Sequence, residues 1–311
     1  MIPCALPKPH YGKLVALSQN RKLPEVDKPR VAQALERYIA WVALMDGLQA
    51  EGQDLLRALV DSINEYKRFI EVDLIYDSPA DFLYRQKGQH KVDNSVLEEF
   101  LPRLADTRLV PGLSRLKSCT VGPQGAFAAF IFAGSVHTPL PDGGIFIKEK
   151  DQDYALSKQV YLRASSDPTF AGDDTLNTVL NVAYLAAECK TNLDKTMFNE
   201  GLETARALKQ AVAGSRYLLL CEWLDMEPID TSSTDIEEVI ILRKAKRLGS
   251  NFREGLATAA GREAARNAFV EYYDGHPLQR ECFGRIVDHM RVVYPENVQL
   301  DEQTILQRGY F

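Results

Sequence analysis

Acidic and basic side chains that could act on a phosphate group lie together in one segment of the chain. Glu188 and Lys190, one residue apart, end an apolar segment that begins at Val182, and the acidic residues Asp173 and Asp174 lie a short distance upstream. Because successive side chains of a strand point to opposite faces, Glu188 and Lys190 would project to the same side. Two carboxylates suit a hard cation such as Mg²⁺, which would polarise a phosphoryl oxygen and lower the pKa of a bound water. The ammonium of Lys190 could orient that water or stabilise the charge that develops on the phosphate.

The pattern Glu-x-Lys is weak evidence alone, because it occurs by chance in most proteins of this length, and a surface ion pair is the simplest alternative. Its context favours a site. Two charges at the end of an otherwise buried strand are costly to place there without partners. Residues that can cap a following helix come next in the chain, namely Asn192, Asp194 and Thr196.

The elements expected around this segment indicate an α/β protein. Apolar residues recur at three- and four-residue steps between about residues 28 and 101, which predicts helices. After residue 120, strands are expected at 126–132, 145–147, 159–162, 182–189 and 216–223, with a helix at 198–212. We therefore predict a mixed central sheet flanked by helices, within a mostly helical region 1–115, a core 116–230 and a helical C-terminal region 231–311.

At these residues the chain resembles the core of the PD-(D/E)xK type II restriction endonucleases, in the run AECKTNLDKTMFNEGLETARALKQ and in RYLLLCEWLDM. It is most similar to the group whose two-subunit members cut asymmetric seven-base-pair sites, and the likeness covers about residues 170–230. The resemblance implies a restriction-endonuclease-like fold, Mg²⁺ as cofactor, and hydrolysis of DNA that leaves 5′-phosphates. It also implies that an Asp and Glu188 bind the metal and that Lys190 is the catalytic lysine.

The position of the metal-binding Asp is left open by the sequence. The literal Pro-Asp pair is Pro141 and Asp142, which lies far upstream in a predicted turn, so we favour Asp174, then Asp173, then Asp142. Glu98 or Glu99 of the preceding helix could assist, although a solvated helix face is the better interpretation of both. Lys195 and Glu200 follow the strand, near where the scissile phosphate would lie, and an ordinary helix surface is an equal alternative for them.

The formal charge of −6 does not indicate a nucleic-acid-binding protein, so DNA contacts must come from local groups. Residues 241–266 contain seven basic and two acidic residues, a net of +5, which on its own is better explained as a solvated helix face. Beside a nuclease site, the stretch gains weight as a DNA-binding surface. The expected DNA-binding residues are Lys195, Arg243, Lys244, Lys246, Arg247, Asn251 and Arg253.

Several other classes of protein are disfavoured. The chain has no His-Glu-x-x-His, Gly-x-Ser-x-Gly or Walker A pattern, which argues against a zinc protease, a serine hydrolase and an ATPase. The five cysteines are scattered and lack a Cys-x-x-Cys pair, which argues against a disulfide framework or structural zinc and suits a reducing cytoplasm. No signal peptide or membrane span is expected.

We therefore expect a type II restriction endonuclease of a prokaryotic cytoplasm that cuts duplex DNA with Mg²⁺ and is paired with a cognate methyltransferase. Because one site cuts one strand, two catalytic subunits are expected, in a homodimer or in a heterodimer with a related chain. The alternatives are a repair or structure-specific nuclease of the same fold, a non-catalytic DNA-binding subunit, and an interaction protein in which the triplet is accidental. Cleavage at one duplex sequence, or failure to bind any divalent metal, would separate them.

Overall fold

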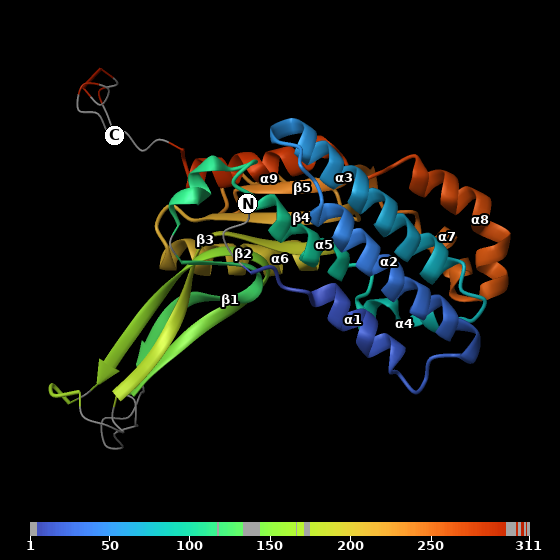
Figure 1. Cartoon of the computed structure of the whole chain (residues 1–311), viewed down its shortest axis with the longest axis horizontal. Coiled ribbons are helices and arrows are strands. Elements are labelled where there is room, and N and C mark those ends of the chain that lie inside the picture. The colour runs from blue at the N-terminus through green and yellow to red at the C-terminus, as the bar shows by residue number, and fades with distance from the viewer. Residues whose placement is uncertain are drawn as a thin grey trace.

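In the computed structural model a five-stranded sheet lies beside a layer of helices from the N-terminal part of the chain (Figure 1). The structure describes residues 5–116, 118–132, 144–165, 167–170 and 175–296, together with Gln303, Leu306, Gln307 and Gly309. Within these residues, no helix combines the length and the apolar character needed to cross a membrane.

The N-terminal layer is helical, as the spacing of its apolar residues predicted. Its helices are α1 (Pro9–Ser18), α2 (Lys28–Asp46), α3 (Gly52–Arg68), α4 (Phe82–His90) and α5 (Ser95–Phe100), and α3 continues into the π-helical segment Phe69–Tyr76. Helix α2 shows why they form, because its buried residues recur every three or four positions and make one apolar stripe. They are Val31, Ala34, Tyr38, Trp41 and Met45.

The sheet has the strand order β1-β2-β3-β4-β5 and is mixed, which confirms the predicted fold class. Its strands are β1 (Cys119–Phe132), β2 (Ile145–Ser165), β3 (Thr175–Leu193), β4 (Arg216–Leu224) and β5 (Glu238–Lys246). β1, β2 and β3 pair antiparallel, whereas β3, β4 and β5 pair parallel. The long antiparallel strands extend from the body as an arm, at the lower left of Figure 1.

Helices cover both faces of the parallel part of the sheet. Alternate residues of β4 therefore belong to two cores: Leu218 and Leu220 pack with α9 (Arg280–Val293) and the N-terminal helices, and Leu219 and Cys221 pack with α6 (Lys195–Ala211). The sequence of β4 is almost uninterruptedly apolar because such a strand is buried on both sides. Helix α6 starts at the predicted place, where the Asp194 side chain accepts a hydrogen bond from the Met197 amide (2.9 Å).

Of three expectations about strands and cysteines, two were wrong and one was incomplete. Residues 238–246, which we expected in a helical tail, form β5, so the sheet continues past the predicted boundary at 230. The strands expected at 145–147 and 159–162 are parts of the single strand β2. We expected no disulfide framework, but Cys119 is disulfide-bonded; the other cysteines within the described ranges are free.

One hydrophobic core includes residues from all three predicted regions. A single cluster of buried side chains joins α1 to α5, strands β1 to β5, and α9. The short helix α7 (Ser250–Glu254) and helix α8 (Ala259–Asp274) complete the C-terminal part. The N-terminal helices therefore lie directly against the strands that carry the candidate site.

Candidate active site

Strand β3 places Glu188 and Lys190 side by side, as its alternation predicted. The Lys190 Nζ lies 2.9 Å from the Glu188 Oε1, and both side chains are about one-fifth exposed. The buried Tyr217 of β4 donates a hydrogen bond from its hydroxyl to the other oxygen of Glu188 (3.1 Å). This hydrogen bond and the ion pair fix the orientation of the Glu188 carboxylate.

A second carboxylate comes from Asp153 in β2, a residue that the sequence analysis did not consider. Its Oδ2 accepts a hydrogen bond from the Cys189 amide at 2.8 Å, so it lies beside the residue that separates Glu188 from Lys190. The pairing of Tyr154 with Ala187 brings these two segments together. The signal for it in the sequence is an acidic residue directly before a buried apolar run, Tyr154 to Leu156.

The acidic residues that we favoured cannot be compared with Asp153 in position, because Asp142, Asp173 and Asp174 lie outside the described residues. Thr175, the next described residue, is the first of β3, and its partner in β2 is Ser165 at the opposite end of the pairing from Tyr154. Along β3, Thr175 and Glu188 are thirteen residues apart, on the order of 40 Å for an extended strand. Among the described residues, Asp153 is therefore the candidate for the metal-binding Asp.

A third carboxylate, Glu98, approaches from helix α5. It is only 9% exposed, and the charge of Asp153 raises its pKa. We expected Glu98 and Glu99 most simply on a solvated helix face, and this was wrong for both. Glu99 instead faces α1 and α2, where it accepts hydrogen bonds from the His10 amide (2.9 Å) and the Tyr38 hydroxyl.

Burial makes ionisation of the Glu98 and Asp153 carboxylates unfavourable. Burial is the largest cause that raises the pKa of Glu98, and the neighbouring Asp153 raises it further. For Asp153 burial is again the largest cause; the hydrogen bond from Cys189 and the charge of Lys190 lower the pKa but do not offset it. Two buried carboxylates that repel each other gain stability from a shared cation, so this pair is suited to a positively charged ligand.

Lys190 remains protonated in this environment. Burial works against its charge, but the hydrogen bond to Glu188 and the charges of Glu188, Asp153 and Glu200 outweigh burial, so the pKa of Lys190 is raised. A raised pKa makes it a poor proton acceptor at neutral pH and a permanent source of positive charge. Cys189 is buried and its pKa is well above its ordinary value, so it is no nucleophile.

The site opens into a cleft of about 400 Å³ between α4, the ends of β3 and β4, and α8. Asp153 and Lys190 line it, together with the aromatic residues Tyr84, Trp223 and Tyr272. Four cations also line the cleft, from α4 and its end and from the segment after β5: Lys87, Lys91, Arg247 and Arg253.

The donor set fits a hard divalent cation better than zinc. Among the described residues, no three His, Cys, Asp or Glu side chains already converge as metal ligands. A preformed zinc site would normally have such a set, whereas Mg²⁺ is usually held by one or two carboxylates and keeps several waters. The carboxylates of Asp153 and Glu98, with Glu188 beside them, offer only oxygen ligands, and Asp153 lines the cleft.

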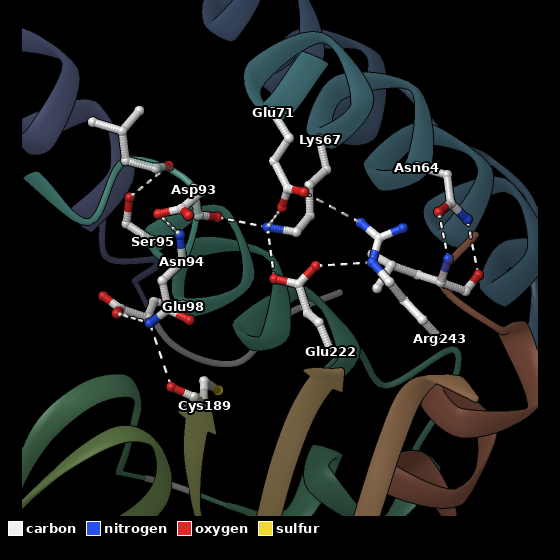
Figure 2. A network of polar contacts seen from close by, with 12 residues as sticks. Asn64, Lys67, Glu71, Asp93, Asn94, Ser95, Glu98, Cys189, Glu222 and Arg243 are labelled. Atoms are coloured by element: carbon white, nitrogen blue, oxygen red, sulfur yellow. Dashed lines mark hydrogen bonds and ion pairs between the residues drawn. The ribbon is translucent and has the colours of Figure 1, made fainter. Parts of the chain in front are cut away.

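One expected DNA-binding residue, Arg243, is part of the interior and cannot read DNA (Figure 2). It is 2% exposed, and it donates hydrogen bonds to Glu222 (3.0 Å), the Tyr273 hydroxyl (2.6 Å) and the His276 carbonyl (2.8 Å). The sequence analysis missed these partners because they come from β4, α8 and the turn after α8, and not from neighbouring residues. Arg262, counted in the same basic stretch, is also buried.

The other expected DNA-binding residues are at the surface, and most have carboxylate partners. Lys244 pairs with Glu281, Lys246 with Glu227 (3.1 Å), Arg247 with Asp225 (2.8 Å) and, more distantly, Arg253 with Asp225 (3.8 Å). The excess positive charge of residues 241–266 is therefore largely balanced by carboxylates from elsewhere in the chain. Lys195 and Asn251 are exposed at the starts of α6 and α7, and only Arg247 and Arg253 of this set line the cleft.

Comparison with known proteins supports the family resemblance. A family model described as Bpu10I restriction endonuclease matches residues 89–311, which include every strand of the sheet and all the acidic site residues. The fold is similar to a solved structure described as "native BbvCI A2B2 tetramer at low resolution", with a TM-score of 0.55 and 18% identity over 91% of this chain and 95% of that one. A search among curated proteins gives no match.

Proposed function

The chain belongs to the Bpu10I restriction endonuclease family, and we propose that it is a type II enzyme that hydrolyses duplex DNA at a specific sequence with Mg²⁺, leaving 5′-phosphates. The observation that carries the proposal is the proximity of Asp153, Glu188 and Lys190, with Glu98 beside Asp153, next to a cleft that Asp153 and Lys190 line. In this proposal they serve as the acidic and basic groups of a PD-(D/E)xK site, and they come from α5, β2 and β3.

Each residue then has a distinct part in the reaction. Asp153, Glu188 and Glu98 would hold the metal ion, which when bound polarises the phosphoryl oxygen and activates water. Lys190, protonated because of its carboxylate neighbours, stabilises the negative charge that develops on the phosphate. Tyr217 keeps one oxygen of Glu188 in place through its hydrogen bond.

Because each chain supplies one such site and one site cuts one strand, we propose that the active enzyme contains two catalytic chains. The structural neighbour is described as an A2B2 tetramer, which favours an assembly with a related second subunit over a homodimer. A cognate methyltransferase in the same prokaryotic cytoplasm would protect the host DNA.

The proposal is tested by incubating the protein with long duplex DNA of mixed sequence and Mg²⁺, beside Glu188→Ala and Lys190→Ala. Discrete fragments from the wild type, absent with EDTA and reduced by at least about 10²-fold in both variants, are expected because each change removes charge used in the transition state. Nicks alone would indicate that a second subunit is missing. Equal cleavage by the wild type and both variants would refute the assigned site.

The lysines of α4 and its C-terminal end should contribute to DNA binding. Lys87 and Lys91 line the cleft and make no ion pair within the described parts of the chain; Lys87 Nζ lies 4.3 Å from the centre of the Tyr84 ring. Replacing both with alanine should weaken DNA binding at every sequence and reduce the slope of log K against log salt by about 0.9 for each phosphate that is no longer neutralised. Fluorescence anisotropy at several salt concentrations, in Ca²⁺ to prevent cleavage, measures this.

The control for that experiment is Arg57→Ala, since Arg57 is exposed on α3, pairs with Asp54 and does not line the cleft. It should leave both the affinity and the salt slope unchanged. A double variant at Lys87 and Lys91 that keeps the wild-type slope would place the DNA backbone elsewhere.

A further inference from the structure

Asn94, which directly precedes helix α5, bridges one carboxylate of the site and the strand that carries Glu188 (Figure 2). Its Nδ2 donates to the Glu98 Oε1 at 3.0 Å and lies 3.4 Å from the Cys189 carbonyl oxygen. The amide of the same Cys189 donates to Asp153. The side chain of Asn94 is therefore in position to fix the distance between α5 and β3, and with it the spacing of Glu98 and Asp153.

The segment that carries Asn94 is itself held from the interior. The fully buried Lys67 donates from its Nζ to the Asp93 carbonyl oxygen (2.7 Å). The Asp93 side chain accepts a hydrogen bond from the backbone N–H of Asn94 (2.9 Å). Lys67 is in turn paired with Glu71 (2.7 Å) and with Glu222 at the end of β4 (2.9 Å). These contacts hold the Asn94 backbone in place. A residue that orients another group needs such a fixed backbone.

The side-chain oxygen of Asn94, Oδ1, is available to bind a ligand. Its Oδ1 is buried and has no hydrogen-bond partner within the described residues, although Asn94 lines the cleft. A buried acceptor without a donor is unfavourable, so such atoms normally have a protein or water partner. Because the side-chain nitrogen Nδ2 already donates to Glu98, the side-chain oxygen Oδ1 can accept a hydrogen bond from a donor in the cleft.

From these contacts we infer that Asn94 is a positioning residue of the metal site. It holds the Glu98 carboxylate in the orientation that binds a divalent cation, and its Oδ1 accepts a hydrogen bond from a water molecule of the cleft. The inference rests on the proposed function, because it concerns the same metal site. Neither the sequence motif nor the family resemblance assigns a role to this residue.

The test is Mn²⁺ binding to the whole protein, measured by electron paramagnetic resonance without DNA, so that the readout does not depend on cleavage. The metal site is defined as the binding that Asp153→Asn removes. Asn94→Ala should weaken this binding by about 10-fold, the lower end of what is lost when a residue that supports a metal ligand is removed. In cleavage assays, the Mg²⁺ concentration for half-maximal rate should rise by a similar factor, and saturating Mg²⁺ should restore most of the rate.

Asn64 provides the matched control, because it also joins distant segments of the chain close to this network. It exchanges two hydrogen bonds with the Leu278 backbone (2.9 and 2.8 Å) but touches none of the site carboxylates. Asn64→Ala should lower the melting temperature and leave Mn²⁺ affinity unchanged. If Asn94→Ala does not fold, Asn94→Leu keeps the bulk of the side chain and donates nothing, and should show the same loss of affinity.

Different outcomes would contradict the role of Asn94 and the proposed function. Wild-type Mn²⁺ affinity in a folded Asn94 variant would overturn the role of Asn94 and leave the proposed function intact. A wild-type protein that binds no Mn²⁺ and cuts no DNA would overturn the proposed function itself. Equal losses of affinity in the Asn94 and Asn64 variants would show that general destabilisation, and not positioning, explains the effect.

Discussion

Replacing Asp153 with asparagine should lower Mg²⁺-dependent DNA cleavage by about 10³-fold or more, which corresponds to about 4 kcal/mol of lost transition-state stabilisation. The carboxylate lies beside the amide that separates Glu188 from Lys190, so it is the acidic group best placed to share a metal with Glu188. Asparagine keeps the size of the side chain and can still accept the hydrogen bond from Cys189, but it carries no charge for the metal. Single-turnover cleavage of a DNA that contains the recognition sequence measures the loss.

The informative comparison is with Asp174→Asn, because Asp174 is the acidic residue that the sequence favoured. If Asp153 is the metal ligand, the Asp174 variant should cleave DNA at close to the wild-type rate. The reverse result, with loss of activity in the Asp174 variant alone, would return the assignment to Asp174.

Loss of folding can be excluded as the cause by measuring the metal-free proteins. The pKa of Asp153 is raised above its ordinary value of 3.8, so the folded state holds this proton more tightly than the unfolded chain does. Ionisation of Asp153 therefore costs stability as the pH rises through its raised pKa, and this cost is absent at lower pH. At pH 7 to 8 without metal, Asp153→Asn should unfold at a denaturant concentration no lower than that of the wild type.

Replacing Lys67 with methionine should destabilise the protein by about 3–5 kcal/mol, the largest effect on stability that we expect for a single charge. Lys67 and Glu222 are both fully buried, and their charged groups lie 2.9 Å apart, with Glu71 on the other side of the ammonium (2.7 Å). Without Lys67, two buried carboxylates face each other, and Arg243 is the cation that still pairs with both of them. Chemical denaturation at neutral pH measures the change in the free energy of unfolding.

The pH dependence of this variant gives an internal check. Burial is the largest cause that raises the pKa of Glu222, and the charge of Glu71 adds to it, whereas Lys67 and Arg243 lower the pKa. Removing Lys67 should raise that pKa further, so the difference in stability between variant and wild type should shrink as the pH is lowered and Glu222 takes up a proton. Lys28→Met, at an exposed pair with Glu25, should change stability by no more than about 0.5 kcal/mol. Similar losses for Lys67→Met and Lys28→Met would show that the buried ion cluster is unimportant for stability.

The parts of the site that could be predicted from the sequence are those fixed by local geometry. Glu188 and Lys190 lie on one face because a strand alternates, and Asp194 caps α6 because its side chain reaches an amide three residues on. The mixed sheet and the helical N-terminal layer followed from apolar periodicity in the same way.

The parts that could not be predicted depend on contacts between residues far apart in the chain. Asp153 reaches Cys189 through strand pairing across a long hairpin, and Glu98 reaches them by packing of a helix on the sheet. β5 was missed because its basic residues resembled a solvated helix face, whereas Arg243 has a carboxylate partner on the neighbouring strand. In each case the residue that a charged side chain contacts lies far from it in the sequence.

The antiparallel pairing of β2 with β3 also determines how this protein and its relatives can vary in length. Tyr154 pairs with Ala187, and the pairing continues outward to Ser165 and Thr175. Equal insertions in both strands beyond this point would lengthen the hairpin and leave Asp153 opposite the Glu-x-Lys segment. One extra residue in a single strand would turn the following side chains to the other face unless a bulge absorbed it, as one does between Leu156 and Ser157. The number of residues between the acidic residue and the Glu-x-Lys triplet is therefore free to drift in evolution, and homologues are better aligned by strand pairing than by a fixed motif spacing.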